Sequence, residues 1–317
     1  MIQELVSEFA GLPVVEFNDE GVFREGERLD APPADVAWRV RVLEDEGSFG
    51  AVFEKFLETV DPSSVTALII GWWQDYGGNG AFDDPVERLL EASDSLTGLR
   101  SLFLGDVVVE EREVSWIPPL GFTPLFEAYP RLERFWMRSG EILDPPRRPW
   151  RPFRAEHLRE LRLESGGLPA AMVRAVAGSD LPALEHLELW LGMRHYGGDA
   201  TVEDLAPILS GERLPSLRHL GLQDAEIQDE ICAAVASAPI VARLESLALS
   251  MGVLTDAGAE ALLSGQPLTH LRSLDLHHNY LSEEMTERIR KALPGVEIDL
   301  SGRQRNDGGW LFVEVAE

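Results

Sequence analysis

The sequence has few of the residues on which redox chemistry, amine chemistry and polyanion binding depend. It contains one cysteine, Cys232, so no disulfide can form within the chain, and the helical spacing of its apolar neighbours indicates a buried structural thiol. Only Lys55 and Lys291 are lysines, and no Gly-Lys-Ser/Thr motif is present to hold a nucleotide phosphate. With 55 acidic against 28 basic residues, the net charge is -27. Because this charge repels phosphate backbones and anionic lipid, neither nucleic acid nor a membrane is an expected partner.

Long apolar runs and common catalytic motifs are also missing. No stretch reaches the ~18 apolar residues that a membrane span requires, and the first residues lack the basic and apolar regions of a signal peptide. We therefore expect a cytoplasmic protein. The motifs His-Glu-x-x-His, Gly-x-Ser-x-Gly and Gly-x-Gly-x-x-Gly do not occur. We expect no metal and no cofactor, and we predict no catalytic residue.

What the sequence does contain is a repeated phrase, Leu-x-x-Leu-x-Leu. Seven good copies begin at positions 99, 132, 158, 184, 217, 244 and 271, and weaker copies begin at 65 and 295. The apolar positions 1, 4 and 6 predict a strand in which positions 3, 5 and 7 point to the opposite, exposed face. Helical patterns lie between the phrases, several of them preceded by Thr, Ser or Asp and followed by Gly. Strands joined by helical crossovers lie parallel, and the wider helix layer bends such a stack into an arc.

This phrase, with its period of 24 to 34 residues and helices such as LTDAGAEALL, resembles the leucine-rich repeat family in its ribonuclease-inhibitor-like form. One departure is that the Asn or Cys usual after the third apolar position is present only at Asn279. The chain also resembles stand-alone bacterial leucine-rich repeat proteins, some of them encoded beside peptide-modifying enzymes. The resemblance implies an α/β solenoid, a curved horseshoe with its parallel sheet on the concave face and helices on the convex face. It further implies a monomeric, non-enzymatic scaffold for a protein or peptide that is encoded nearby.

The domain organisation follows from the limits of the repeat. Residues 1–64 are expected to form a cap of strands and a helix that is continuous with the solenoid. Residues 65–300 hold about nine repeat units. The alternating WLFVEVAE within residues 301–317 predicts a capping strand at the other end. The chain is thus expected to be one domain.

The outward positions of the strands predict a binding surface. Aromatic and arginine residues gather there, as they do at the centres of interfaces, and the arginines predict a partner that is locally acidic. The predicted concave patch consists of Phe103, Arg134, Trp136, Arg138, Arg162, His186, Glu188, Trp190 and His219. As alternatives, Trp136 and Trp190 fold against neighbouring loops, and Glu188 with His186 and His219 is an accidental pairing or an acid–base group.

Two loops share a Tyr-Gly-Gly motif, in GWWQDYGGNGA from residue 71 and in WLGMRHYGGDA from residue 190. Their glycines permit positive φ where the chain turns back. The aromatic residues Trp72, Tyr76 and Tyr196 either fill the loop bases or form a rim. In the second case a pocket beside Trp190 and Tyr196 would serve a small-molecule binder or an enzyme.

A second unusual segment is rich in proline and arginine, and its prolines exclude a regular helix. It either neutralises nearby carboxylates or binds an anionic partner. Its arginines are Arg147, Arg148, Arg151 and Arg154.

Overall fold

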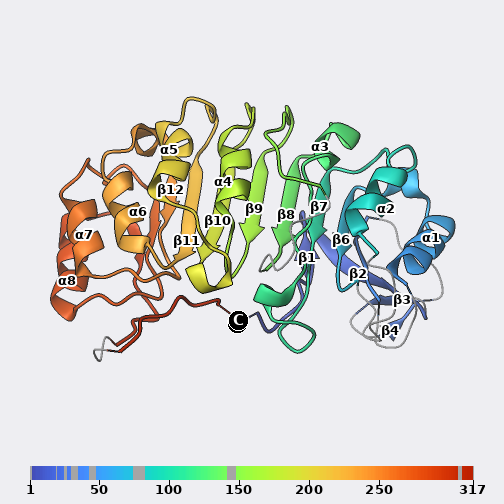
Figure 1. Cartoon of the computed structure of the whole chain (residues 1–317), viewed down its shortest axis with the longest axis horizontal. Coiled ribbons are helices and arrows are strands. Elements are labelled where there is room, and N and C mark those ends of the chain that lie inside the picture. The colour runs from blue at the N-terminus through green and yellow to red at the C-terminus, as the bar shows by residue number, and fades with distance from the viewer. Residues whose placement is uncertain are drawn as a thin grey trace.

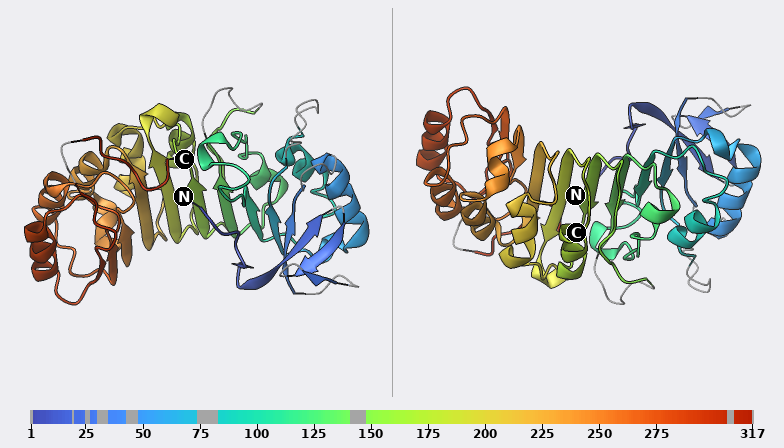
Figure 2. Two further views of the ribbon diagram at one scale, coloured as in Figure 1. Left: turned by 90° about the horizontal axis from the view of Figure 1, so that it is seen from below. Right: turned by 90° about the horizontal axis from the view of Figure 1, so that it is seen from above.

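The computed structural model describes residues 2–18, 20–24, 27–29, 35–42, 48–73, 83–140, 148–305 and 309–316. These residues form an arc in which one long sheet lines the inner face and helices cover the outer face (Figure 1). The side views in Figure 2 show the helices stacked outside the row of strands. The α/β solenoid predicted from the repeat is confirmed.

The strands fall on the repeated phrases. In order they are β6 (Ala67–Ile70), β7 (Ser101–Leu104), β8 (Arg134–Arg138), β9 (Glu160–Glu164), β10 (His186–Gly192), β11 (His219–Ala225), β12 (Ser246–Ala248), β13 (Ser273–Asp275) and β14 (Glu297–Asp299). Each pairs in parallel with the next. Equivalent repeat positions lie opposite one another, as His186 does His219, so each outward position forms a row that runs along the sheet.

Residues before the first good repeat extend the same sheet. They contribute β1 (Glu8–Phe9), β2 (Leu12–Asn18), β3 (Gly21–Arg24), β4 (Glu27–Arg28) and β5 (Ala37–Val40). Strand β5 pairs in parallel with both β6 and β2, whereas β3, β4 and β1 add antiparallel pairs beyond β2. The sheet is therefore continuous from the N-terminal strands to β14.

The helices occupy the segments between strands. The α-helices are α1 (Phe49–Thr59), α2 (Pro85–Glu91), α3 (Leu125–Ala128), α4 (Ala170–Ala177), α5 (Val202–Ser210), α6 (Gln228–Val235), α7 (Asp256–Leu263) and α8 (Glu283–Ala292), with 3-10 turns η1 (Pro62–Ser64), η2 (Val114–Trp116), η3 (Arg194–Tyr196) and η4 (Pro239–Arg243). Helix α5 begins with a capping box between Thr201 and Asp204 and ends at Gly211 with φ +70°. Between β8 and β9 the described residues, 139–140 and 148–159, form no helix, as the prolines predict.

The core lies between the sheet and the helices. The inward leucines at repeat positions 4 and 6, such as Leu187 and Leu189, are fully buried. Asn279 is also buried, where its side chain donates to Leu276 O and accepts from Leu281 N, and this stabilises the turn after β13. Along each strand the buried leucines alternate with outward residues, and this alternation fixes the register of the strands.

The C-terminal segment departs from the prediction. Residues 309–316 form no strand and do not pair with β14. They run back along the ends of earlier strands, where Glu314 N donates to Met251 O and Val315 N donates to Asp224 Oδ1. Val313 and Val315 are buried. Apolar and polar residues do alternate in this segment, and the two valines are buried. They are buried against loops because the backbone N–H groups bind acceptors in turns and not a neighbouring strand.

The loop after β7 and the η2 turn that follows it bind the two ends of the described chain. Val109 N donates to Ile2 O at 2.9 Å, and Ser115 Oγ donates to Ala316 O. Figure 2 shows the two ends close together over the middle of the arc. The N-terminal segment consequently crosses the concave side of the sheet before it enters β2.

Candidate functional site

The N-terminal part of the concave face is covered by the chain itself. The ring of Phe9 lies 6.0 Å from that of Phe103 and 5.2 Å from that of Trp136, centroid to centroid. These rings belong to a second apolar cluster, on the concave side, that also contains Ala67 and Ile69. Phe103 has no exposed surface. Phe103 was expected to face a partner, and that expectation was wrong because Phe9, distant in sequence, packs over it.

Two of the concave arginines are paired with glutamates on the next strand. Arg134 Nε lies 2.5 Å from Glu160 Oε2, and Arg138 Nε lies 2.8 Å from Glu164 Oε2. Both pairs join residues that lie opposite each other in the register of β8 and β9. Arg138 is also buried. It was predicted to contact a partner but instead forms part of the folded structure.

Arg162 is the centre of an aromatic and ionic stack. Its guanidinium carbon lies 5.3 Å from the ring centroid of Trp136 and 5.4 Å from that of Trp190, a cation–π arrangement on both sides. Its Nε lies 2.6 Å from Glu164 and 2.9 Å from Glu188. Burial opposes the charge of Arg162, yet the surrounding carboxylates raise its pKa. Trp190 is only 6% exposed, so the prediction that it presents an open surface was wrong.

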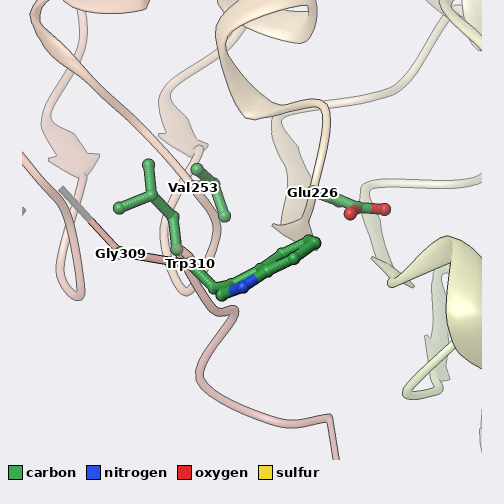
Figure 3. A pocket seen from close by; sticks show the side chains of 5 residues that line it. Glu226, Val253, Gly309 and Trp310 are labelled. Atoms are coloured by element: carbon green, nitrogen blue, oxygen red, sulfur yellow. The ribbon is translucent and has the colours of Figure 1, made fainter.

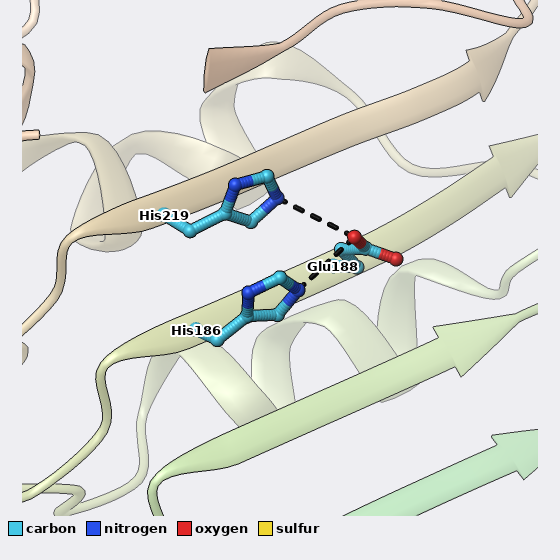
Figure 4. Close-up of side chains that lie close together, drawn as sticks. All are labelled: His186, Glu188 and His219. Atoms are coloured by element: carbon cyan, nitrogen blue, oxygen red, sulfur yellow. Dashed lines mark hydrogen bonds and ion pairs between the residues drawn. The ribbon is translucent and has the colours of Figure 1, made fainter. Parts of the chain in front are cut away.

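Beyond Arg162, two histidines and a glutamate converge on the open part of the concave face (Figure 4). His186 Nε2 lies 3.0 Å and His219 Nε2 3.4 Å from the same oxygen, Glu188 Oε1. The imidazole rings stack with centroids 3.9 Å apart. Burial would raise the pKa of Glu188, but hydrogen bonds from the two histidines and the charge of Arg162 hold it well below its usual range. The sequence signal for this His–Glu–His cluster is a histidine at position 3 of two consecutive repeats.

The residues expected at a rim do not form one. Trp72 is buried in the core, Tyr196 is half-buried in η3, and Tyr76 lies outside the described residues. Gly197, which follows Tyr196, has φ +91°, so this Tyr-Gly-Gly loop does use its glycine to turn. The structure therefore favours the structural interpretation of the loop at Tyr196.

A shallow cavity lies elsewhere, beside the C-terminal segment (Figure 3). It has a volume of about 450 Å³, and neither Trp190 nor Tyr196 is among its lining residues, which are Glu226, Val253, Gly309, Trp310 and Leu311. Trp310 is 88% exposed. This cavity is open and weakly enclosed, so it does not correspond to the pocket expected beside Trp190.

Two described arginines of the proline-rich segment, Arg148 and Arg154, lie near carboxylates, whereas Arg151 is exposed. Arg148 pairs with Glu87 at 3.1 Å, and Arg154 pairs with Asp180 at 3.0 Å. Arg147 lies outside the described residues. These pairs support the interpretation of the segment as a surface loop that neutralises acidic neighbours.

Comparison with known proteins places this architecture in a family. A family model described as a leucine-rich repeat matches residues 244–263. A protein from Bacteroides fragilis of known crystal structure is similar to the chain at 31% identity, over 84% of this chain and 73% of that one, with a TM-score of 0.74. The chain is a leucine-rich repeat protein.

A leucine-rich repeat protein of Leptospira interrogans was also found, at 12% identity over 81% of this chain and 92% of that one, but its TM-score is only 0.21. A comparison of the sequence with curated proteins found no match. Proteins of the leucine-rich repeat type are in general scaffolds for protein binding and not enzymes. Among the described residues, the helices are too short or too polar to cross a bilayer.

Proposed function

We propose that this leucine-rich repeat protein is a non-enzymatic scaffold that binds a protein or peptide segment on the open part of its concave face, over β9 to β13. The observation that supports this location is the packing of Phe9 over Phe103 and against Trp136, which covers the concave face at β6 to β8. Any partner on the concave side must then contact the later strands. The proposal includes action as a cytoplasmic monomer.

The open part of the concave face is polar and half-exposed. His186, His219, Ser246, Ser273 and Asp275 contribute its outward side chains, all of intermediate exposure. Hydroxyl, imidazole and carboxylate groups at strand spacing suit an extended segment, whose backbone and side chains offer donors at similar intervals.

The charges of the concave face alter the kind of partner first expected. An acidic partner was predicted from Arg134, Arg138 and Arg162, but each of these arginines is already paired with a glutamate. A partner carboxylate would have to displace an existing ion pair, which gives it little net gain. We therefore propose a partner segment rich in hydrogen-bond donors or positive charge, in keeping with the net charge of -27.

The test uses one bulky substitution on the open surface and a matched one away from it. Ser273→Arg places a long cation on the concave side of β13, and Ser264→Arg places the same side chain at the exposed end of α7. The full-length protein and both variants are used to capture partners from the native host. A captured candidate is then purified and titrated against all three proteins.

We expect Ser273→Arg to weaken binding at least tenfold and Ser264→Arg to leave it unchanged. Binding of the unsubstituted protein should also slow as salt rises, because opposite charges steer the encounter. A partner that binds Ser273→Arg as well as the unsubstituted protein would place the interface elsewhere and contradict the proposal.

A further inference from the structure

We infer that His186, Glu188 and His219 form a binding site for one divalent transition-metal ion, with Zn²⁺ as the best fit. This site goes beyond the scaffold function, because it recognises an ion by coordination and requires no partner segment. It rests on the arrangement of the three side chains, on the groups that orient them and on the space that a glycine leaves for them.

The strand register brings the three ligands together. His186 and His219 lie opposite each other on the parallel strands β10 and β11, and Glu188 follows His186 by two residues, so all three side chains leave the same face. Their ligand atoms all lie within 4.8 Å of one another. Figure 4 shows both Nε2 edges directed at the carboxylate.

The two distances from Glu188 to the histidines are close to those between neighbouring ligands of one ion. Zinc binds histidine nitrogen and carboxylate oxygen at about 2.0 to 2.2 Å, so ligand atoms of a tetrahedral site are roughly 3.3 to 3.5 Å apart. Glu188 Oε1 lies 3.0 Å from His186 Nε2 and 3.4 Å from His219 Nε2. The two imidazole rings are nearly parallel, with an interplanar angle of 9°, so an ion between the three atoms requires the rings to tilt toward each other until both in-plane lone pairs point at it. Each Nε2 must also be without its proton, which Nδ1 of the same ring then carries.

The groups around the ligands hold them in the orientation that coordination needs. Ser246 Oγ lies 2.7 Å from His219 Nδ1, which leaves Nε2 of that ring for the metal. Arg162 Nε lies 2.9 Å from Glu188 Oε2, which leaves Oε1. Such contacts from a second layer of residues fix ligand orientation in known metal sites.

A glycine provides the room for the glutamate. Gly221 lies opposite Glu188 on β11, and a Cβ added at Gly221 would come within 2.9 Å of Glu188 Cγ. A side chain at this position would push the carboxylate away from the histidines. Gly221 is therefore the element of the repeat that permits the His–Glu–His arrangement.

The location allows an ion to enter from solvent. The side chains of His186, His219 and Glu188 are 33%, 19% and 13% exposed, so the site is lined by the sheet and open on one side. Two imidazoles and one carboxylate favour Zn²⁺, Co²⁺ or Cu²⁺ over Mg²⁺ and Ca²⁺, which prefer oxygen ligands. Three protein ligands leave at least one coordination position for water.

The experiment titrates Zn²⁺ into the full-length protein, freed of any affinity tag, by isothermal calorimetry. We expect one ion per chain, and at least a tenfold loss of affinity in His186→Ala and in His219→Ala. His195→Ala, an exposed histidine in another loop, is the matched control and should bind as the unsubstituted protein does. Gly221→Ala should weaken binding while leaving all three ligands present.

A second readout separates coordination from a loss of structure. Co²⁺ bound to nitrogen and oxygen ligands has visible absorption bands, which should appear in the unsubstituted protein and in His195→Ala but not in His186→Ala. Circular dichroism and thermal melting confirm that each variant is folded. Failure of the unsubstituted protein to bind Zn²⁺ would overturn the inference. So would equal binding by the folded double variant His186→Ala/His219→Ala, or loss of binding only in His277→Ala, which belongs to the separate Asp275, His277 and Asp299 cluster.

Discussion

Asp224 Oδ1 accepts a hydrogen bond of 2.9 Å from Val315 N, which joins residues 91 positions apart in the sequence. Asp224 lies near the end of β11 in a left-handed conformation, φ +54°, and it is fully buried. With the bond from Glu314 N to Met251 O, this contact holds the C-terminal segment along the turns of the solenoid and not beside β14. A buried carboxylate that binds one N–H group also makes stability depend on pH.

We predict that the folded protein loses stability as pH rises because of Asp224, and that Asp224→Asn removes this loss. Burial raises the pKa of Asp224 well above its ordinary value of 3.8. A group with a raised pKa in the folded state stabilises the fold below its unfolded pKa, and this contribution is lost as pH rises through the folded pKa. Asn keeps the acceptor oxygen but does not titrate. Urea denaturation at pH 5 and pH 8 should show the variant gaining on the unsubstituted protein at the higher pH, and an identical difference at both values would refute the prediction.

The contact between His277 and Glu314 makes stability depend on pH in a second way, over a different pH range. Hydrogen bonding to Asp275, with the charge of Glu314, raises the pKa of His277 from 6.5 to about 9. The stabilisation is thus complete below about pH 6.5 and is lost as pH rises through 9. Hydrogen exchange at the amide of Glu314 should accelerate across this window beyond its intrinsic rise. His277→Gln should show only the intrinsic rise, and an equal excess in both proteins would exclude His277 as the cause.

Substitutions in β10 and β13 test which strand residues are buried. Leu187→Ala should lower the free energy of unfolding by about 2 to 5 kcal/mol, because it leaves a cavity between sheet and helices. Trp190→Ala should also cost about 3 to 5 kcal/mol, since Trp190 is nearly buried and packs on Arg162. Ser273→Ala, on the open face, should change stability by less than about 0.5 kcal/mol. Chemical denaturation in which Trp190→Ala behaves like Ser273→Ala would show that Trp190 is exposed in solution.

The side chain of Phe9, which covers the N-terminal part of the concave face, can be removed by a single substitution. Phe9→Ala should destabilise the protein by about 3 to 5 kcal/mol and expose Trp136 to water. The tryptophan fluorescence of the folded variant should shift to longer wavelength. Glu8→Ala, at an exposed position of the same strand, is the control and should show neither effect. Unchanged fluorescence in Phe9→Ala would mean that Phe9 does not cover Trp136.

The ion pairs of the concave face could be predicted from the register of the repeats. Once the phrases are aligned, Arg134 lies opposite Glu160 and Arg138 opposite Glu164, so their pairing follows from sequence alone. The same alignment shows arginine and glutamate alternating at position 2, from Arg100 to Arg272. Residues of this row form exposed ion pairs such as Arg159–Glu185 at 2.9 Å. The prediction of an arginine-rich surface for an acidic partner treated Arg134 and Arg138 as unpaired, although Glu160 and Glu164 occupy the same positions in the next repeat.

Other parts of the site could not be read from local pattern. Nothing near Phe103 in the sequence indicates that Phe9 covers it, and nothing in WLFVEVAE distinguishes a sheet strand from a segment bound to turns. An alternating segment buries one face in either case, so periodicity does not identify what it is buried against. The convergence of His186 and His219 on Glu188 likewise depends on side-chain torsions and on the space left at Gly221.

The solenoid, the parallel sheet and the inward and outward positions of its strands all follow from the sequence, because a local repeat makes every unit bury its leucines against the next. Which outward positions are open depends instead on contacts between distant parts of the chain. The two terminal segments pack onto the sheet and its turns through contacts between residues distant in the chain, such as Phe9 with Trp136 and Val315 with Asp224. Each of these contacts forms once, between one apolar ring or one N–H group and its partner. They therefore leave no repeating pattern in the sequence.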